Sequence, residues 1–198
     1  MWEEPESVVG RHLASGEKLL WSGKPRGGIR LRASDAMMIP FSLMWGGFAI
    51  FWESMVLWGP PGARHGGKPV PIFMALWGIP FVLVGLYIMV GRFFVDAKLR
   101  EKTFYGITNQ RIVIVSGLFS SSVKSLNLPT LAEVTLSEKS DGSGTITLGA
   151  MPSNMRGMVG VPWPGASRYV PPSLEMIEGV SQVYNLIRKA QLDAGKQA

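Results

Sequence analysis

The chain contains no cysteine, and this absence removes several classes of function. Without thiols there is no disulfide, no cysteine nucleophile and no thiolate metal site. Histidine is nearly as scarce, because His12 and His65 lie far apart and have no ligand-type neighbours. We therefore expect no metal, no cofactor and no His-based catalytic centre.

Charge is also missing from two long stretches. Residues 36–58 hold one charged side chain, Glu53, and residues 69–91 hold none. Each stretch has 23 residues, and roughly 20 apolar residues cross roughly 30 Å of hydrocarbon. The sequence therefore predicts two transmembrane helices, joined by an external loop at 59–68.

Basic residues cluster on both flanks of this hairpin. Short flanks rich in Lys and Arg stay in the cytoplasm. We expect a multi-pass protein of a bacterial inner membrane, with residues 1–35 and 92–198 both cytoplasmic. The flanking cations are Lys24, Arg26, Arg30 and Arg32 before the hairpin, and Arg92, Lys98, Arg100 and Lys102 after it.

The rest of the chain shows the patterns of short strands. Residues 19–23 form an apolar run closed by Gly and Pro, and residues 28–32 alternate apolar and basic side chains. Beyond Arg92 the hydrophobic period changes from helix to strand. Residues 103–149 predict about five antiparallel strands, with a hairpin turn at Asp141-Gly142.

The last expected element is an amphipathic helix. Ser173 follows two prolines and is suited to an N-cap, and acidic residues follow it. The apolar residues recur at spacings of three and four, which predicts a helix with one apolar face. They are Leu174, Ile177, Val180, Tyr184 and Ile187.

Four segments of the chain carry a resemblance to a known family. They are Gly16–Pro25, Tyr105–Ile112, Asp141–Ile146, and Leu174–Ile177 leading to Val183–Ile187. In this order they resemble small bacterial membrane proteins with a pleckstrin-homology-like (PH-like) domain, and with the hairpin the match covers nearly the whole chain. Leu174 and Gly179 depart from the Phe and Asp often present there, which concerns packing and not chemistry.

This resemblance implies an α+β membrane protein. A two-helix transmembrane hairpin would be inserted in a PH-like antiparallel β-barrel or sandwich, capped by the C-terminal amphipathic helix. Strand 19–23 would then belong to the same barrel as residues 92–198. The family implies a membrane-tethered binding or scaffolding module, with no established ligand and no site residues to carry over.

The basic cluster beyond the hairpin is a candidate contact for anionic lipid headgroups or a phosphorylated ligand. It comprises Lys98, Arg100, Lys102 and Arg111. The competing interpretation is that these cations only set topology. Arg111 opens a strand and has an alternative of its own, an ion pair with a carboxylate on a neighbouring strand.

Two further features carry alternatives. Glu53 is a candidate polar contact in a helical oligomer, or it snorkels to the outer interface or pairs there with Arg64 or Lys68. Loop 150–169 is a candidate partner or membrane-interface surface, or it folds over one opening of the barrel. Its residues of interest are Met151, Met155, Met158 and Trp163.

The sequence holds no paired carboxylates, no Ser/His/Asp set and no phosphate-loop pattern. We therefore expect a non-enzymatic inner-membrane protein that presents a PH-like module at the cytoplasmic membrane surface. Its partners would be the bilayer, anionic headgroups, and an unknown protein or further copies of itself, but no nucleic acid. The alternative is an accessory subunit of a membrane complex, for example a transporter, with the hairpin as interface.

Overall fold

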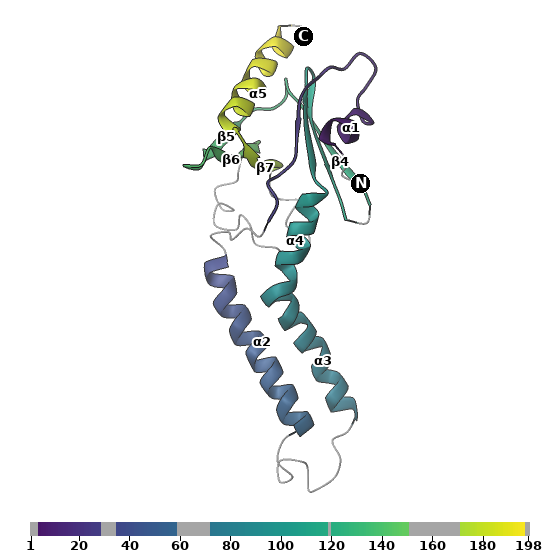
Figure 1. The fold of residues 1–198 in the computed structure, drawn as a ribbon, viewed down its shortest axis with the longest axis vertical. Helices are drawn as coiled ribbons and strands as arrows, with labels where there is room; N and C mark the ends of the chain where they lie inside the picture. Colours follow the sequence, from purple (N-terminus) through teal and green to yellow (C-terminus); the bar gives the residue numbers. More distant parts are fainter. Residues whose placement is uncertain (1–3, 29–34, 59–71, 119, 151–170, 197–198) are drawn as a thin grey trace. The chain divides into compact units, whose positions relative to one another are not determined.

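The computed structural model describes residues 4–28, 35–58, 72–118, 120–150 and 171–196, and is an α+β structure with antiparallel sheets (Figure 1). The chain divides into two compact units. One combines residues 1–28 with residues 97–198, and the other comprises residues 29–96. The first, globular unit is thus built from two stretches of chain that the second, apolar unit interrupts.

The apolar unit is helical. Helix α2 (Asp35–Trp58) is followed by α3 (Ile72–Leu86), which continues through a π-helical turn, η2 (Tyr87–Gly91), into α4 (Arg92–Glu101). By length and composition, α2 and the continuous run Ile72–Glu101 could each cross a membrane. Most of their large apolar side chains are exposed, which is the opposite of the core helices of a water-soluble protein.

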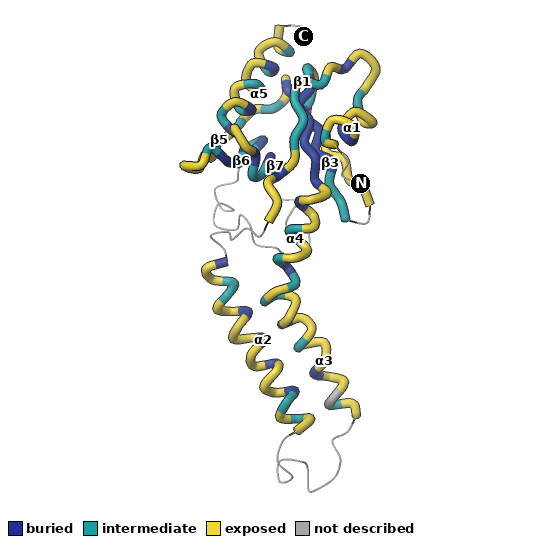
Figure 2. Tube along the Cα trace, viewed as in Figure 1, coloured by how far each residue is buried: buried dark blue, intermediate teal, exposed yellow. Residues whose placement is uncertain are grey.

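Small side chains form the contact between α2 and α3. On α2 the buried residues within the hairpin are Ser42, Gly46, Ala49 and Glu53, at spacings of four, three and four (Figure 2). A Cβ atom on Gly85 of α3 would lie 2.9 Å from the Cα atom of Gly46. The two backbones approach so closely that Gly85 has no room for a Cβ atom, whereas a Cβ atom on Gly46 would meet the Met89 side chain first.

The first sheet of the globular unit joins chain from both sides of the apolar unit. Its order is β1 (Leu19–Gly23), β2 (Phe104–Thr108), β3 (Arg111–Ser116), β4 (Ser122–Asn127), all antiparallel. The strand expected at 19–23 forms and pairs with β2. The residues before and after the two long helices are therefore hydrogen-bonded to each other.

The second sheet contains β5 (Val134–Glu138), β6 (Ser143–Leu148) and β7 (Ser173–Glu178), again antiparallel. Gly142 has φ of 73° in the β5–β6 hairpin turn, as its Asp-Gly sequence predicts. The five strands expected between residues 103 and 149 are confirmed, although they divide between two sheets.

Strands β2 and β3 are buried on both faces, which explains why they are apolar except at their ends. One face joins the main core, with the second sheet and helix α5 (Val180–Gly195). The other face lies against α1 (Pro5–Gly10), through a smaller core formed by Val8, Val9, Phe104, Val113 and Val115.

The expected start of the C-terminal helix at Ser173 is wrong. Residues 173–178 form β7, and the helix begins at Val180 after Gly179, whose φ is 60°. Leu174 and Ile177 are both buried, three residues apart, because the register shifts between Ile146 and Gly144, and Met176 has φ of 52°. An irregular strand thereby reproduces the spacing of a helix.

The expected change from helix to strand just beyond Arg92 is also wrong. Helix α4 continues to Glu101, and the first strand beyond it begins at Phe104. Lys98 and Arg100 occupy the last turn, where cations interact favourably with the helix dipole. The strand expected at 28–32 lies, apart from Gly28, outside the described residues.

Candidate functional site

A cavity of about 770 Å³ opens on the α1 side of the first sheet, entirely within the globular unit. We call it the cationic cavity. Four parts of the chain surround it: α1 and the residues after it, the segment after β1, the junction of α4 with β2, and the turn between β3 and β4. The described residues that line it are Val8, Arg11, His12, Lys24, Pro25, Gly27, Glu101, Lys102, Phe104, Val115, Ser116, Gly117, Leu118, Ser120 and Ser121.

One wall of the cationic cavity is apolar. Val8 from α1, Phe104 from β2 and Val115 from β3 line it and also belong to the smaller core. All three are less than a tenth exposed. This wall is rigid because its side chains are packed in the fold rather than presented on a mobile surface.

The polar wall carries excess positive charge. Arg11, Lys24 and Lys102 are cationic, and the one carboxylate among the described lining residues, Glu101, lies 2.9 Å from Lys98 Nζ in an ion pair. The Lys102 ammonium donates a hydrogen bond to the Leu118 carbonyl, 3.2 Å away, which holds it at the β3–β4 turn.

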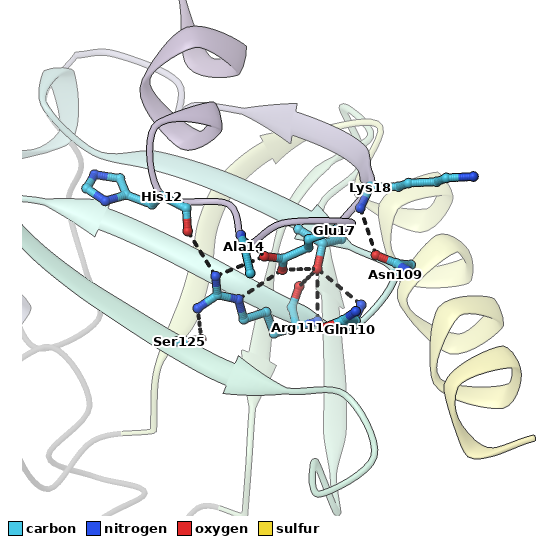
Figure 3. A network of polar contacts seen from close by, with 9 residues as sticks. His12, Ala14, Glu17, Lys18, Asn109, Gln110, Arg111 and Ser125 are labelled. Atoms are coloured by element: carbon cyan, nitrogen blue, oxygen red, sulfur yellow. Dashed lines mark hydrogen bonds and ion pairs between the residues drawn. The ribbon is translucent and has the colours of Figure 1, made fainter. Parts of the chain in front are cut away.

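A network of polar contacts around Glu17 and Arg111 includes His12, one of the residues that line this cavity (Figure 3). Arg111 donates from Nε to Glu17 Oε1 and from Nη2 to Oε2, each at 2.9 Å. The Thr108 hydroxyl donates to Oε1 at 2.7 Å, and the Ala14 amide donates to Oε2 at 2.8 Å. The side chain of Glu17 is fully buried, and each of its carboxylate oxygens accepts two hydrogen bonds, as a buried charged group requires.

This network positions the residues that line the cationic cavity. Arg111 Nη2 also donates to the His12 carbonyl at 2.9 Å, and Nη1 donates to Ser125 Oγ at 3.1 Å. The segment between α1 and β1 is therefore fixed to the first sheet at His12 and Ala14. Arg111 is a positioning residue for Arg11 and His12, not a lining residue.

The same contacts shift the ionisation of Glu17. The hydrogen bonds from Arg111, and those from Ala14 and Thr108, lower the pKa of Glu17 to about 2 against the opposing effect of burial. The hydrogen bond to Glu17 raises the pKa of Arg111 above its usual value. Both groups are charged throughout the physiological range, so the pair is a permanent structural link.

The segment after β1 is fixed in a similar way. The Arg26 guanidinium lies 3.1 Å from the carboxylates of Asp141, in the β5–β6 turn, and of Glu178, in β7, and its amide donates to the Met176 carbonyl at 2.9 Å. Arg100 Nη2 donates to the Gly28 carbonyl at 3.1 Å. These contacts hold in place the stretch that contributes Lys24, Pro25 and Gly27 to the cationic cavity.

The four cations of the basic cluster lie in different settings. Lys98 is exposed and paired with Glu101, Arg100 is buried on Gly28, and Arg111 binds Glu17. Of the four, Lys102 lines the cationic cavity. The structure brings it together with Arg11, His12 and Lys24, which the sequence did not single out as a group.

Glu53 points into the hairpin and not toward its end. Its side chain lies against Gly78 of α3, where a Cβ atom would collide with the carboxylate. It is 8% exposed, and its Oε2 atom has no hydrogen-bond partner among the described residues. Arg64 and Lys68, its expected alternative partners, lie outside the described residues, as do Met151, Met155, Met158 and Trp163.

Comparison with known proteins gives one distant relative. The chain is 27% identical over 164 residues to a protein of Rhodobacter capsulatus described as an uncharacterized 23.7 kDa protein in the puhA 5' region. The match covers 82% of this chain and 72% of that protein. No family model and no solved structure matches the chain.

Proposed function

We propose that the protein is a non-enzymatic inner-membrane protein that holds a PH-like binding module against the cytoplasmic membrane surface. The observation that carries this proposal is the pairing of β1 with β2. Because the strands are separated in sequence by two long apolar helices, both ends of the hairpin are attached to one folded unit. A module attached twice has less freedom than a domain on a single tether.

Three features support the membrane and PH-like parts of the proposal. The exposed side chains of α2 and α3 are largely apolar, which suits hydrocarbon and not water. Basic residues flank both helices, as expected for cytoplasmic ends. Antiparallel sheets followed by one C-terminal helix agree with the outline of a PH-like domain.

Single-cysteine reporters test this arrangement directly, because the native chain has no cysteine. We would introduce Ser140→Cys in the globular unit and Ala63→Cys in the loop between the helices. A membrane-impermeant maleimide should label Ala63→Cys in intact spheroplasts, and Ser140→Cys only after lysis. Equal labelling of both in spheroplasts, or release of the protein from membranes by alkaline carbonate, would contradict the proposal.

The second candidate function is an accessory subunit of a membrane complex. The Oε2 atom of Glu53 supports it. Although this side chain faces Gly78 within the hairpin, its Oε2 atom has no hydrogen-bond partner among the described residues, and an unsatisfied carboxylate oxygen is costly in an apolar setting. The glycines do not add to this case. Gly46, Gly78 and Gly85 face the opposite helix within the hairpin, so they are already used inside the chain.

Glu53→Gln and a neighbouring control, Ser54→Ala, test this candidate. Ser54 is half-buried, and its hydroxyl donates a hydrogen bond to the Phe51 carbonyl of its own helix. If the hairpin is an interface, Glu53→Gln should lower the yield of co-purifying membrane partners or the oligomeric mass in mild detergent, and Ser54→Ala should not. Unchanged assembly of both variants would remove this candidate.

A further inference from the structure

We infer that the cationic cavity binds a phosphate group carried by a molecule with an apolar part. This inference deepens the proposed function, because it assigns a ligand class to the module, and it rests on that proposal for the access of the site to lipid. Its argument depends only on the described residues of the globular unit.

The first step is the convergence of charge. Arg11 follows α1, Lys24 follows β1, and Lys102 follows α4, so three separate chain segments each supply one cation to the same cavity. Lys and Arg are the side chains that bind phosphate through charge-assisted hydrogen bonds. The carboxylate of Glu101 opposes them less than its formal charge indicates, because Lys98 pairs with it.

The second step is the supply of further donors and their fixed placement. Three lining serines, Ser116, Ser120 and Ser121, offer hydroxyl groups. Lys102 uses one of its three ammonium protons on the Leu118 carbonyl, which places its charge at the turn that bears these serines. The site is therefore arranged before any ligand enters, which lowers the entropy that binding costs.

The third step concerns what else the ligand carries. A bare phosphate ion would fill a small fraction of a cavity of about 770 Å³, a volume within the range of organic-ligand sites. The buried wall of Val8, Phe104 and Val115 offers contacts to carbon and none to a charged oxygen. The combination of an apolar wall and a cationic wall fits a phosphate ester better than a free anion.

Two sources could supply that chemistry: the headgroup of an anionic phospholipid or a soluble phosphate ester. Lys24 and Lys102 are, along the chain, close to the two points where the globular unit passes into the apolar unit, after Gly28 and before Ala97. One experiment with a lipid arm and a soluble-ester arm distinguishes the two sources.

The experiment uses the full chain in nanodiscs of phosphatidylcholine. Isothermal titration with phenyl phosphate, whose ring supplies the apolar part, and with inorganic phosphate tests the soluble source. Nanodiscs formed from a mixture of phosphatidylcholine and phosphatidic acid test the lipid source, with the composition of retained lipid measured by mass spectrometry. Saturable binding of the ester, or enrichment of phosphatidic acid, is the expected result.

The decisive variant is Lys24→Gln/Lys102→Gln, and its charge-matched control is Lys124→Gln/Lys139→Gln. The control cations are exposed and do not line the cavity. The cavity variant should weaken ester binding, or reduce lipid enrichment, by at least about tenfold, since the loss of a single charge-assisted contact already has about that effect. The control should change neither.

A second pair of variants protects the test against misfolding. Ser121→Glu introduces negative charge at an exposed lining residue, and Ser122→Glu introduces it at the next exposed residue, which does not line the cavity. Only Ser121→Glu should abolish binding, with unchanged thermal unfolding.

Equal effects of cavity and control variants, or no binding from either source, would overturn the inference. A protein that remains inserted in the membrane while failing these tests would leave the proposed function standing. A protein that binds the soluble ester through this cavity but is not inserted in membranes would overturn the proposed function alone.

Discussion

At the scale of single residues, the contact between Glu17 and Arg111 is the most consequential in the globular unit. Arg111 was a candidate for ligand contact, with an ion pair on a neighbouring strand as the alternative. The structure shows a two-pronged ion pair with Glu17, which comes just before β1. An arginine committed in this way contributes to the cationic cavity through the backbone that it holds.

Arg111→Met should destabilise the globular unit by about 3 kcal/mol, because it leaves the buried Glu17 carboxylate without its cation. The measurement is thermal or urea unfolding of the full chain in mild detergent. The double variant Glu17→Gln/Arg111→Met should recover part of the loss, since neither charge then remains buried alone. Equal stability of Arg111→Met and the wild type would contradict this role.

The same pair predicts a pH dependence. The folded pKa of Glu17 is about 2, below the 4.5 of an unperturbed Glu, so the unfolded chain binds more protons between these values. The stabilisation is complete above pH 4.5, and about 3 kcal/mol is lost as the pH falls toward 2. Unfolding midpoints near neutral pH and at about pH 3 should differ less in Glu17→Gln/Arg111→Met than in the wild type. Identical pH dependence of the wild type and the double variant would contradict this role of the Glu17–Arg111 pair.

At the scale of elements, the hairpin of α2 and α3 depends on close approach of their backbones. Gly85→Ala should separate the helices, because the added Cβ atom lies 2.9 Å from the Gly46 Cα atom, which cannot rotate away. We expect a loss of about 1–3 kcal/mol in resistance to detergent unfolding. Gly47→Ala is the matched control, since a Cβ atom there meets nothing within 4 Å. Equal effects of both variants would argue against this packing.

Element boundaries depended on more than local pattern. The helical run beyond Arg92 was missed because ten residues of mixed charge lie between an apolar segment and a β-rich one. The strand at 173–178 was missed because its bulge gives Leu174 and Ile177 a spacing of three. In both cases the outcome was decided by the neighbouring element, which a single segment of sequence does not contain.

At the scale of the whole molecule, β1 precedes the apolar unit in the chain but pairs with β2, which follows that unit. A chain in which a short Gly/Ser linker replaces residues 29–96 should therefore fold as a water-soluble protein, since Gly28 and Arg100 are already joined by a hydrogen bond of 3.1 Å. Removal of residues 1–23 from that chain should unfold it, because β2 then loses one of its two neighbouring strands and the smaller core loses Val8 and Val9. Circular dichroism and gel filtration would measure both outcomes. An insoluble first variant, or a folded second one, would contradict the insertion.

The sequence by itself determined the secondary-structure classes and most strands, because apolar period and turn chemistry are local properties. Two long charge-poor runs, the Asp-Gly hairpin and the strand at 19–23 were all readable in this way. The sequence also identified Arg111 and Glu53 as charged residues with a candidate role beyond the surface of the fold.

Only the tertiary structure decided which cations share a site. Lys24 and Lys102 are 78 positions apart in the chain, and Arg11 is further still from Lys102, so no local pattern relates them. They meet because β1 pairs with β2 across the interruption and because Glu17 and Arg111 fix the segment between α1 and β1. The cationic cavity is thus a product of long-range pairing, whereas the basic cluster beside the hairpin was a product of sequence proximity alone.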